Sequence, residues 1–161
     1  MPKIEKISCH KIVNSRGEWT IETTVHLDDG TEGVSRVPSG ASTGENEAVT
    51  LPVEKAVEVV NTSLNDALVG EDPSEQEVLD QVMIDMDATP YKSNLGGNSI
   101  LSVSLGLATA MAKSKDMELY SYLSELFTGK ELSASELSFP TPVFNVLNGG
   151  KHANNDLSFK S

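Results

Sequence analysis

The spacing of apolar residues changes once along this chain, and this change constrains the fold more than any other feature. Before residue 38, apolar side chains recur at every second position, which is the period of a half-buried β-strand. After residue 51 they recur at i, i+3, i+4 and i+7, which is the period of an amphipathic α-helix. Strands followed by helices predict an α+β domain, in which a three-stranded antiparallel sheet carries about four helices on one face.

The strand period covers three segments. Apolar and polar side chains alternate loosely over residues 4–13, which form the first expected strand. Over residues 19–27 the side chains of the two expected faces alternate strictly. The side chains expected to face the core are those of Trp19, Ile21, Thr23, Val25 and Leu27. Asp29-Gly30 is a hairpin signal, so residues 31–37 are expected to return antiparallel as the third strand.

The first two expected helices have recognisable boundaries. One starts near Pro52 and stops at Gly70; its apolar stripe is Val53, Ala56, Val57, Val60 and Leu64. The next opens with Asp72-Pro73-Ser74-Glu75, which we interpret as an N-cap, a first-turn proline and a capping-box glutamate. Its expected apolar stripe is Val78, Leu79, Val82, Met83 and Met86.

Two further helices are expected near the end of this region. Residues 98–113 are too apolar all round for a surface helix, so we expect them to form the central helix of the domain. Residues 118–127 form the last helix, and Gly129 is placed to cap its end. The side chains that this last helix is expected to bury are Leu119, Tyr122, Leu123 and Leu126.

Composition and charge exclude several classes of protein. Acidic residues outnumber basic residues by 24 to 12, and the net charge of −12 argues against nucleic acid or an anionic membrane as partner. No run approaches the roughly 20 apolar residues of a membrane span, and the first residues do not open a signal peptide, so a cytoplasmic location is expected. Cys9 alternates with Ile7, which favours a buried, inert thiol over a reactive one.

Residues 38–44 join the expected strands to the expected helices, and their sequence is Pro38-Ser39-Gly40-Ala41-Ser42-Thr43-Gly44. The glycines permit unusual backbone angles, and the three hydroxyl groups can cap a helix, hold a phosphate or bind a hard cation. No Gly-Lys-Ser/Thr follows, so this is not a P-loop. From the residues alone, a plain surface linker and a functional loop both remain open.

The C-terminal part of the chain suggests a second domain. Residues 130–137 are largely polar and are interpreted as a linker. Residues 139–147 are typical of a buried strand, yet no partner strand follows within the 161 residues. We therefore interpret residues 1–137 as one α+β domain and residues 138–161 as the first strand and loop of another.

Four motifs, in this order and spacing, resemble signatures of the enolase family (phosphopyruvate hydratase), namely its N-terminal domain and the first strand of its barrel domain. They are Ser15-Arg16-Gly17, residues 37–44, Lys92-Ser93 with Leu95-Gly96-Gly97-Asn98-Ser99-Ile100-Leu101, and Asn145-Val146-Leu147-Asn148-Gly149-Gly150-Lys151-His152-Ala153. One such motif would be a weak signal. Four in register favour a functional loop at residues 38–44.

The resemblance implies a Mg²⁺-dependent lyase of glycolysis, which converts 2-phosphoglycerate to phosphoenolpyruvate and water. In this family two Mg²⁺ ions stabilise the enolate and a lysine accepts the proton. The resemblance assigns Ser42 as a ligand of the second Mg²⁺ and His152 as a substrate contact from another loop. The other residues of the mobile loop are Ser39, Gly40, Ala41, Thr43 and Gly44.

The resemblance also suggests a subunit contact. Arg16 and Glu22 correspond to positions near the contact between subunits in the family, so a homo-oligomer is one expected arrangement. Without a partner, both residues could equally be solvated surface charges. His10 and His26 lie on expected strands and are interpreted as surface or edge residues.

The chain departs from the family pattern at three places. The family's Asp-Ser-Arg-Gly-Asn-Pro-Thr appears here as Asn14-Ser15-Arg16-Gly17-Glu18-Trp19-Thr20. The family's Arg-Asp-Gly-Asp segment and the glycine-lysine stretch behind it are absent near residue 51, which shortens the covering loop. A catalytic glutamate of the family corresponds to Ser161, so no catalytic set is complete. The catalytic lysine and the carboxylate ligands of the first Mg²⁺ belong to the family's barrel.

These observations leave two alternatives. In the first, the chain is the N-terminal part of an enolase, and its partner is a barrel domain or another enolase-type subunit. In the second, it is a catalytically dead enolase-like module that serves binding or assembly. In both cases we expect no hydratase activity from the 161 residues alone and no stable Mg²⁺ binding, because one serine and one histidine cannot hold the ion against water.

Overall fold

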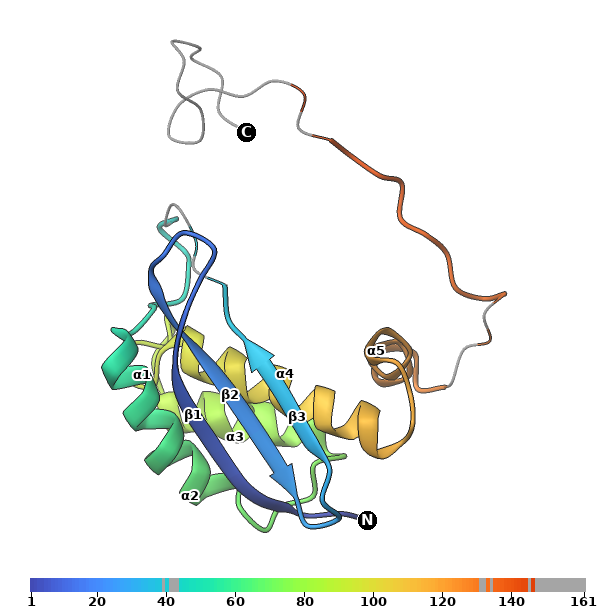
Figure 1. The fold of residues 1–161 in the computed structure, drawn as a ribbon, viewed down its shortest axis with the longest axis horizontal. Helices are drawn as coiled ribbons and strands as arrows, with labels where there is room; N and C mark the ends of the chain where they lie inside the picture. Colours follow the sequence, from blue (N-terminus) through green and yellow to red (C-terminus); the bar gives the residue numbers. More distant parts are fainter. Residues whose placement is uncertain (39, 41–43, 131–132, 134, 145, 147–161) are drawn as a thin grey trace. The chain divides into compact units, whose positions relative to one another are not determined.

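The sheet of the computed structural model has three antiparallel strands in the order β1-β2-β3, namely β1 (Ile4–Val13), β2 (Trp19–Leu27) and β3 (Glu32–Arg36) (Figure 1). The structure describes residues 1–161 except 39, 41–43, 131, 132, 134, 145 and 147–161. The chain forms two compact units, Met1–Glu131 and Leu132–Ser161. The helices and strands of the described residues all lie in the first unit.

The turn between β2 and β3 fixes the register of the hairpin. The Gly30 N–H donates to the Leu27 carbonyl at 3.0 Å, and the Leu27 N–H donates to the Thr31 carbonyl at 2.9 Å. Gly30 has a φ of +87°, in the left-handed region that glycine adopts at little cost. The hairpin predicted from Asp29-Gly30 is therefore confirmed.

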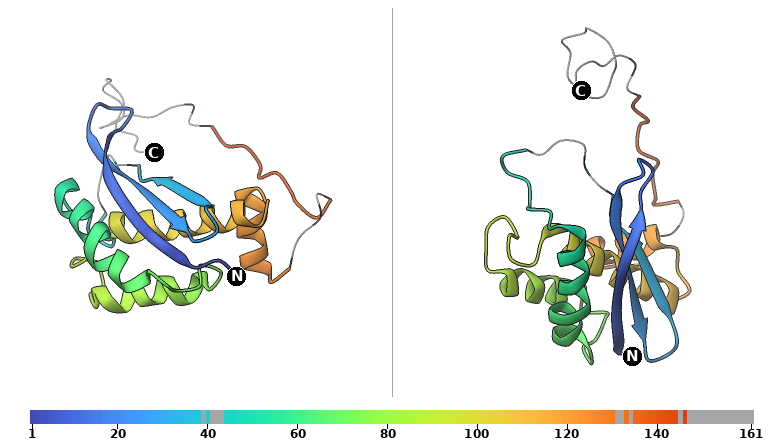
Figure 2. Two further views of the ribbon diagram at one scale, coloured as in Figure 1. Left: turned by 60° about the horizontal axis from the view of Figure 1, so that its bottom comes forward. Right: turned by 60° about the vertical axis from the view of Figure 1, so that its left-hand side comes forward.

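The helices cover one face of the sheet, as predicted. α4 (Gly97–Ser114) packs on β2 and β3, while α1 (Val53–Val59), the π-helical turn η1 (Val60–Leu64) and α2 (Asn65–Leu68) follow β1. α3 (Gln76–Asp87) packs on α4. The right-hand view of Figure 2 shows α1, α2 and α3 together on one side of the strands.

α4 is the central helix, and it lies almost directly on the backbone of β3. A Cβ atom added at Gly33 would be 2.2 Å from the Gly106 carbonyl oxygen, so only glycine permits this approach. The Ser35 hydroxyl donates to the Ser102 carbonyl at 2.5 Å, and the Thr23 hydroxyl donates to the Ser102 hydroxyl at 2.9 Å. Small residues in α4 thus allow close packing, and its hydroxyl groups join it to the sheet.

β1 is an edge strand, and two asparagines bond to its outer backbone groups. The Asn65 Oδ1 accepts from the Ile7 N–H, and the Asn61 Oδ1 accepts from the Cys9 N–H, each at 2.9 Å. The Asn61 Nδ2 also donates to the Cys9 carbonyl at 2.9 Å. These bonds cover part of an edge that could otherwise pair with a strand of another molecule. Asn61 and Asn65 belong to the helix predicted between Pro52 and Gly70. The structure confirms this helix as α1, η1 and α2 in succession, with a π-helical turn in the middle.

The predicted start of the second helix is wrong. α3 begins at Gln76, and Glu75 precedes it without a side-chain cap. The Asp72 Oδ1 accepts instead from the N–H and the hydroxyl of Ser74, at 3.0 and 2.7 Å. The predicted capping box is therefore replaced by a separate turn, because the Asp72 side chain bonds to Ser74 and leaves Glu75 outside the helix.

The predicted apolar stripe of α3 is only partly buried. Leu79 and Met83 are buried, whereas Val78, Val82 and Met86 are exposed. The helix packs mainly on α4, so only the side chains that point to α4 are covered.

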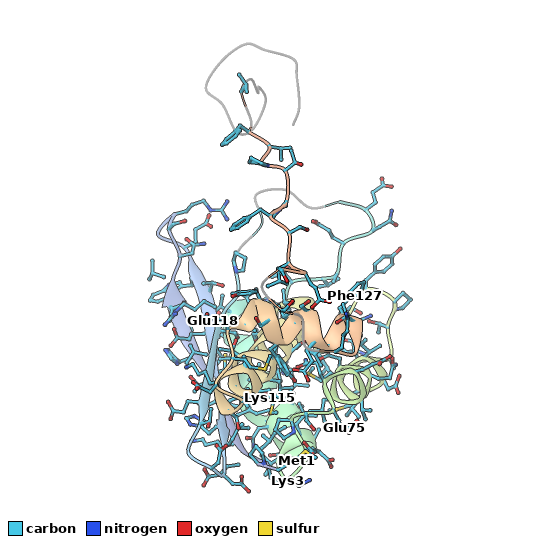
Figure 3. All side chains as sticks on the ribbon, turned by 90° about the vertical axis from the view of Figure 1, so that its right-hand side faces the viewer. Met1, Lys3, Glu75, Lys115, Glu118 and Phe127 are labelled. Carbon is cyan, nitrogen blue, oxygen red and sulfur yellow. The ribbon has the colours of Figure 1, made fainter. Side chains whose placement is uncertain are left out.

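α5 (Leu119–Thr128) also has an apolar face that is mostly uncovered. It buries Tyr122, but Leu119, Leu123 and Leu126 are 36%, 43% and 41% exposed, so the predicted burial of these three leucines is wrong. α5 packs mainly on α4, which covers one side of it. Figure 3 labels Glu118 and Phe127 at the two ends of α5. Gly129 caps the helix with a φ of +72°, as predicted.

Two predictions about β1 and β2 have different outcomes. Cys9 is buried, as predicted, and burial raises the pKa of its thiol although a hydrogen bond with Thr23 lowers it. Trp19 was predicted to face the core, but it is 57% exposed because it lies at the first residue of β2, at the rim of the sheet. The Lys11 ammonium lies 5.2 Å from the centre of its ring.

The described residues of the second unit contain neither helix nor strand. Phe139, Val143, Phe144 and Val146 are between 81% and 102% exposed, so the buried strand predicted at 139–147 is not present in the described part of this segment. Residues 145 and 147 lie outside the described residues. The predicted domain boundary at residue 137 stays a prediction. Within the described part of the whole chain, no helix is both long and apolar enough to cross a membrane.

Candidate functional site

The predicted functional loop follows β3, at the end of the sheet where the β1–β2 hairpin turns (Figure 1). Pro38, Gly40 and Gly44 are described. Of the predicted site residues, Ser39, Ala41, Ser42, Thr43, His152 and Ser161 lie outside the described residues. The structure therefore shows the surroundings of the loop rather than its centre.

The β1–β2 hairpin contacts the loop through Arg16. The Arg16 Nη2 donates to the Gly40 carbonyl at 3.3 Å, and the Arg16 Nε pairs with Glu18 at 3.1 Å. The Asn14 Oδ1 accepts from the N–H groups of Arg16 and Glu18 at 2.9 and 3.0 Å, which fixes the turn that carries the guanidinium. The subunit contact expected for Arg16 stays a prediction.

Glu22 lies on the outer face of the sheet and contacts His10 and Arg36 on the two neighbouring strands. The His10 Nε2 is 3.3 Å and the Arg36 Nε is 2.5 Å from its carboxylate oxygens. Nearby, His26 lies between the Ser8 hydroxyl at 3.1 Å and the Glu32 carboxylate at 3.0 Å. His10 is exposed, as predicted, and His26 is half-buried on the middle strand. The subunit contact expected for Glu22 also stays a prediction.

Both flanks of the loop are bonded to the body of the domain. On the first flank, the Val37 N–H donates to the Ile21 carbonyl at 3.3 Å, and the Thr20 hydroxyl donates to the Val37 carbonyl at 2.6 Å. On the second flank, the Val49 N–H donates to the Tyr91 carbonyl at 2.7 Å. The two ends of the intervening segment are therefore held in place.

The second flank is bonded further by the start of α4. The Gly97 N–H donates to the Val49 carbonyl at 2.7 Å. The Asn98 side chain accepts from the Leu51 N–H at 3.0 Å and donates to the Leu51 carbonyl at 3.1 Å. One asparagine thus satisfies both backbone groups of Leu51, as a neighbouring strand would.

Gly96 and Gly97 allow these two segments to come together. A Cβ atom at Gly96 would lie 2.6 Å from the Leu51 Cγ, and one at Gly97 would lie 2.8 Å from the Ala48 Cβ. Gly96 also has a φ of +84°. The Leu95-Gly96-Gly97-Asn98 motif therefore has a physical role, which is to let residues 48–51 pack against the start of α4.

Asp87 organises the loop before α4, and sequence reasoning missed this residue. Its buried carboxylate accepts from the N–H groups of Asn94 and Leu95 at 3.0 and 2.7 Å, and from the N–H and hydroxyl of Thr89. Burial raises the pKa of Asp87, but the hydrogen bonds from Thr89, Leu95 and Asn94 lower it more, so the pKa lies below its usual value. The Asp-x-Thr pattern of residues 87–89 was the available signal.

A cleft of about 650 Å³ borders the loop and its second flank. Trp19, Pro38, Glu47, Lys92, Asn98 and Leu101 are among the residues that line it. A shallower depression of about 920 Å³ lies at the edge of β1, where Asn61 and Asn65 already bond to the strand backbone. The cleft is the stronger candidate because it adjoins the predicted loop.

The described residues do not form a complete site for Mg²⁺. In the part of the chain that the structure describes, no three His, Cys, Asp or Glu side chains lie together in a way that could hold a metal ion. A Mg²⁺ site needs six oxygen ligands with carboxylates among them, and Ser42 offers one neutral oxygen. The expectation about Mg²⁺ stays a prediction.

A family match emerges from comparison with known protein families. The family described as "Enolase, N-terminal domain" matches residues 4–123 of the 161. The matched range runs from β1 into α5, and it contains the Arg16 hairpin, both flanks of the predicted loop and the loop that Asp87 organises.

Proposed function

We propose, from the premise that this chain belongs to the enolase family through its N-terminal domain, that it acts as the N-terminal part of a phosphopyruvate hydratase. Its task is to supply the loop of Ser42 and the loop of His152 to a substrate held by a barrel domain. The observation that supports this best is the bonding of Val37 and Val49, which holds both ends of the first loop.

The proposed reaction is the reversible loss of water from 2-phosphoglycerate, which gives phosphoenolpyruvate. When bound, Mg²⁺ neutralises the negative charge of the enolate, as is general for the enolase superfamily. This chain contributes the Ser42 hydroxyl as a neutral oxygen ligand and His152 as a contact to the substrate. A loop closed over the substrate also excludes water from the reacting groups.

The proposal requires a barrel as partner. The proton-accepting lysine and the carboxylate ligands of the family belong to that domain, and none of the described acidic residues forms a comparable cluster. We therefore expect the 161-residue chain alone to be inactive. A cytoplasmic location fits a glycolytic enzyme, and Arg16 and Glu22 are the residues proposed for a contact between subunits.

A catalytically dead enolase-like module is the second candidate. Ser161 stands where the family has a catalytic glutamate, and serine cannot act as a carboxylic acid. The segment after Leu51 is also shorter than in the family, which reduces the cover over the substrate. In this alternative the chain binds a partner but does not support turnover.

A coupled assay of phosphoenolpyruvate formation tests the proposal. The purified chain is given 2-phosphoglycerate and excess Mg²⁺, alone and with a separately expressed enolase barrel fragment. We expect no turnover from the chain alone and turnover from the mixture, which Ser42→Ala reduces and the exposed control Ser63→Ala leaves unchanged. Turnover by the chain alone would contradict the expected inactivity. A barrel that binds without turnover would favour the dead module.

A further inference from the structure

Lys92 has an unusual backbone conformation that its loop holds in place. Its φ is +56°, in the left-handed region that side chains other than glycine rarely adopt. The Lys92 carbonyl accepts from the Gly96 N–H at 2.8 Å, and the loop is fixed from the other side by buried Asp87. Such conformations persist only where the surroundings impose them, and they cluster at binding sites.

The ammonium group of Lys92 has no acidic partner among the described residues. Lys92 is half-buried and lines the cleft, yet none of the ion pairs of the described chain includes it. The cleft also contains Glu47 and Asp80, but these carboxylates bond to other groups. Glu47 accepts from the Gly44 N–H at 2.7 Å, and Asp80 accepts from Gln76 and Ser104. In a chain with a net charge of −12, a half-buried ammonium group without an acidic partner among the described residues is available to pair with an anion.

Three of the exposed side chains of the cleft are large and apolar, beside the exposed polar residues Glu47 and Thr50. Trp19, Ile84 and Leu101 all line it and are 57%, 37% and 46% exposed. A free phosphate or a small organic acid would leave these groups in contact with water. A protein segment would cover them, because interfaces combine apolar contacts with a few charged pairs at defined positions.

We propose that the cleft is a docking site for an apolar protein segment that carries one carboxylate, and that this carboxylate pairs with Lys92. The inference rests on the proposed function in one respect, because it takes the barrel as the natural source of the segment. The assignment of Lys92 itself depends on its place in the cleft, on the lack of an ion pair to it among the described residues and on the exposed apolar side chains of Trp19, Ile84 and Leu101.

Trp19 provides a direct signal for the first experiment, because it is the single tryptophan of the chain and lines the cleft. The probes are two capped peptides, acetyl-Leu-Glu-Leu-amide and acetyl-Leu-Gln-Leu-amide, which are titrated against Trp19 fluorescence. We expect the glutamate peptide to bind about fivefold more tightly, as a partly exposed ion pair allows. Lys92→Met removes this preference, whereas Lys92→Arg and the exposed control Lys6→Met retain it.

Three results would overturn the inference. One is equal affinity for the two peptides, and another is the absence of binding by either. The third is displacement of the glutamate peptide by inorganic phosphate or acetate at equal concentration, which would indicate a site for small anions. Unchanged urea midpoints show that each variant is folded before its affinity is interpreted.

A second experiment separates this inference from the proposed function. The affinity of the barrel fragment is measured by calorimetry for the full chain and for Lys92→Met, and we expect about a fivefold loss. If the barrel fragment restores turnover and binds the Lys92→Met variant as tightly as the unmodified chain, the docking role of Lys92 is overturned and the proposed function still stands. A barrel that does not bind the unmodified chain would count against the proposed function, and the peptide experiment would still decide the role of Lys92.

Discussion

Replacing Asp87 by asparagine tests the residue that organises the loop before α4. The buried carboxylate accepts two hydrogen bonds at each oxygen: those of Asn94 and Leu95 at one, and those of the Thr89 N–H and hydroxyl at the other. Asparagine has nearly the same shape, but its Nδ2 cannot accept. Two groups therefore lose their acceptor in either orientation of the amide. At about 1–3 kcal/mol for each of the two unsatisfied groups, the expected loss in the free energy of unfolding is about 2–6 kcal/mol.

Urea unfolding measures this loss, with Trp19 fluorescence and far-UV circular dichroism as independent signals. Asp85→Asn is the matched control, because Asp85 is on the same helix, is exposed and, among the described residues, accepts only from the Gln81 side chain, at 2.7 Å. We expect the control to stay within about 0.5 kcal/mol of the unmodified chain. A loss below this value in Asp87→Asn, or equal losses in both variants, would refute the role of Asp87.

The same variant carries a pH signature. The folded chain lowers the pKa of Asp87, because the hydrogen bonds from Thr89, Leu95 and Asn94 outweigh the effect of burial, which raises it. A carboxyl with a lower pKa in the folded state stabilises the protein above its unfolded pKa of about 4 and loses this contribution as pH falls through the folded pKa. The stability difference between the unmodified chain and Asp87→Asn should thus be constant near neutral pH and shrink below about pH 4. A difference that is unchanged in acid would contradict this account.

Three further predictions concern packing, reactivity and association. Gly33→Ala places a Cβ 2.2 Å from the Gly106 carbonyl oxygen and should lower the free energy of unfolding by about 1–3 kcal/mol. The control Gly44→Ala should be nearly neutral, because its Cβ meets the Glu47 Cγ at 3.9 Å and no nearer atom of the described residues. Equal effects of the two variants in urea unfolding would be inconsistent with the close α4–β3 packing. Cys9 is buried with a raised pKa, so it should react with a thiol reagent far more slowly in the folded chain than in urea, and equal rates would show that it is accessible. Phe139, Val143, Phe144 and Val146 of the second unit are exposed, so the full chain should associate at high concentration, whereas a chain that ends at Leu137 should stay monomeric. Solution size measured for both chains checks this, and identical monomers would count against association through this segment.

The sequence predicted those parts of the fold in which local chemistry decides the structure. The alternation in β2 and the Asp29-Gly30 turn determine the hairpin, because each works between neighbouring residues. Residues 98–113 were predicted to be the central helix, and α4 occupies this place. The predictions failed where burial depends on a distant neighbour. Leu123 in α5 keeps a helical spacing, but spacing cannot tell whether another element covers it.

The candidate site divides in the same way. Its motifs are visible in the sequence, and the close packing at Gly96 and Gly97 explains why one of them contains two glycines. The bonds from Asp87 to Leu95 and from Asn98 to Leu51 were not predicted, because they join residues whose approach depends on the path of a loop. The unpaired charge of Lys92 within the described residues was equally invisible, since it depends on which acids lie nearby in three dimensions.

The rate of phosphoenolpyruvate formation, measured while the barrel fragment is titrated into a fixed amount of this chain, tests the central claim most directly. The account predicts no product without the barrel, a rate that rises with added barrel and a plateau at one barrel per chain. A barrel fragment whose rate is the same with and without this chain would contradict the claim that residues 1–161 supply a required part of a phosphopyruvate hydratase.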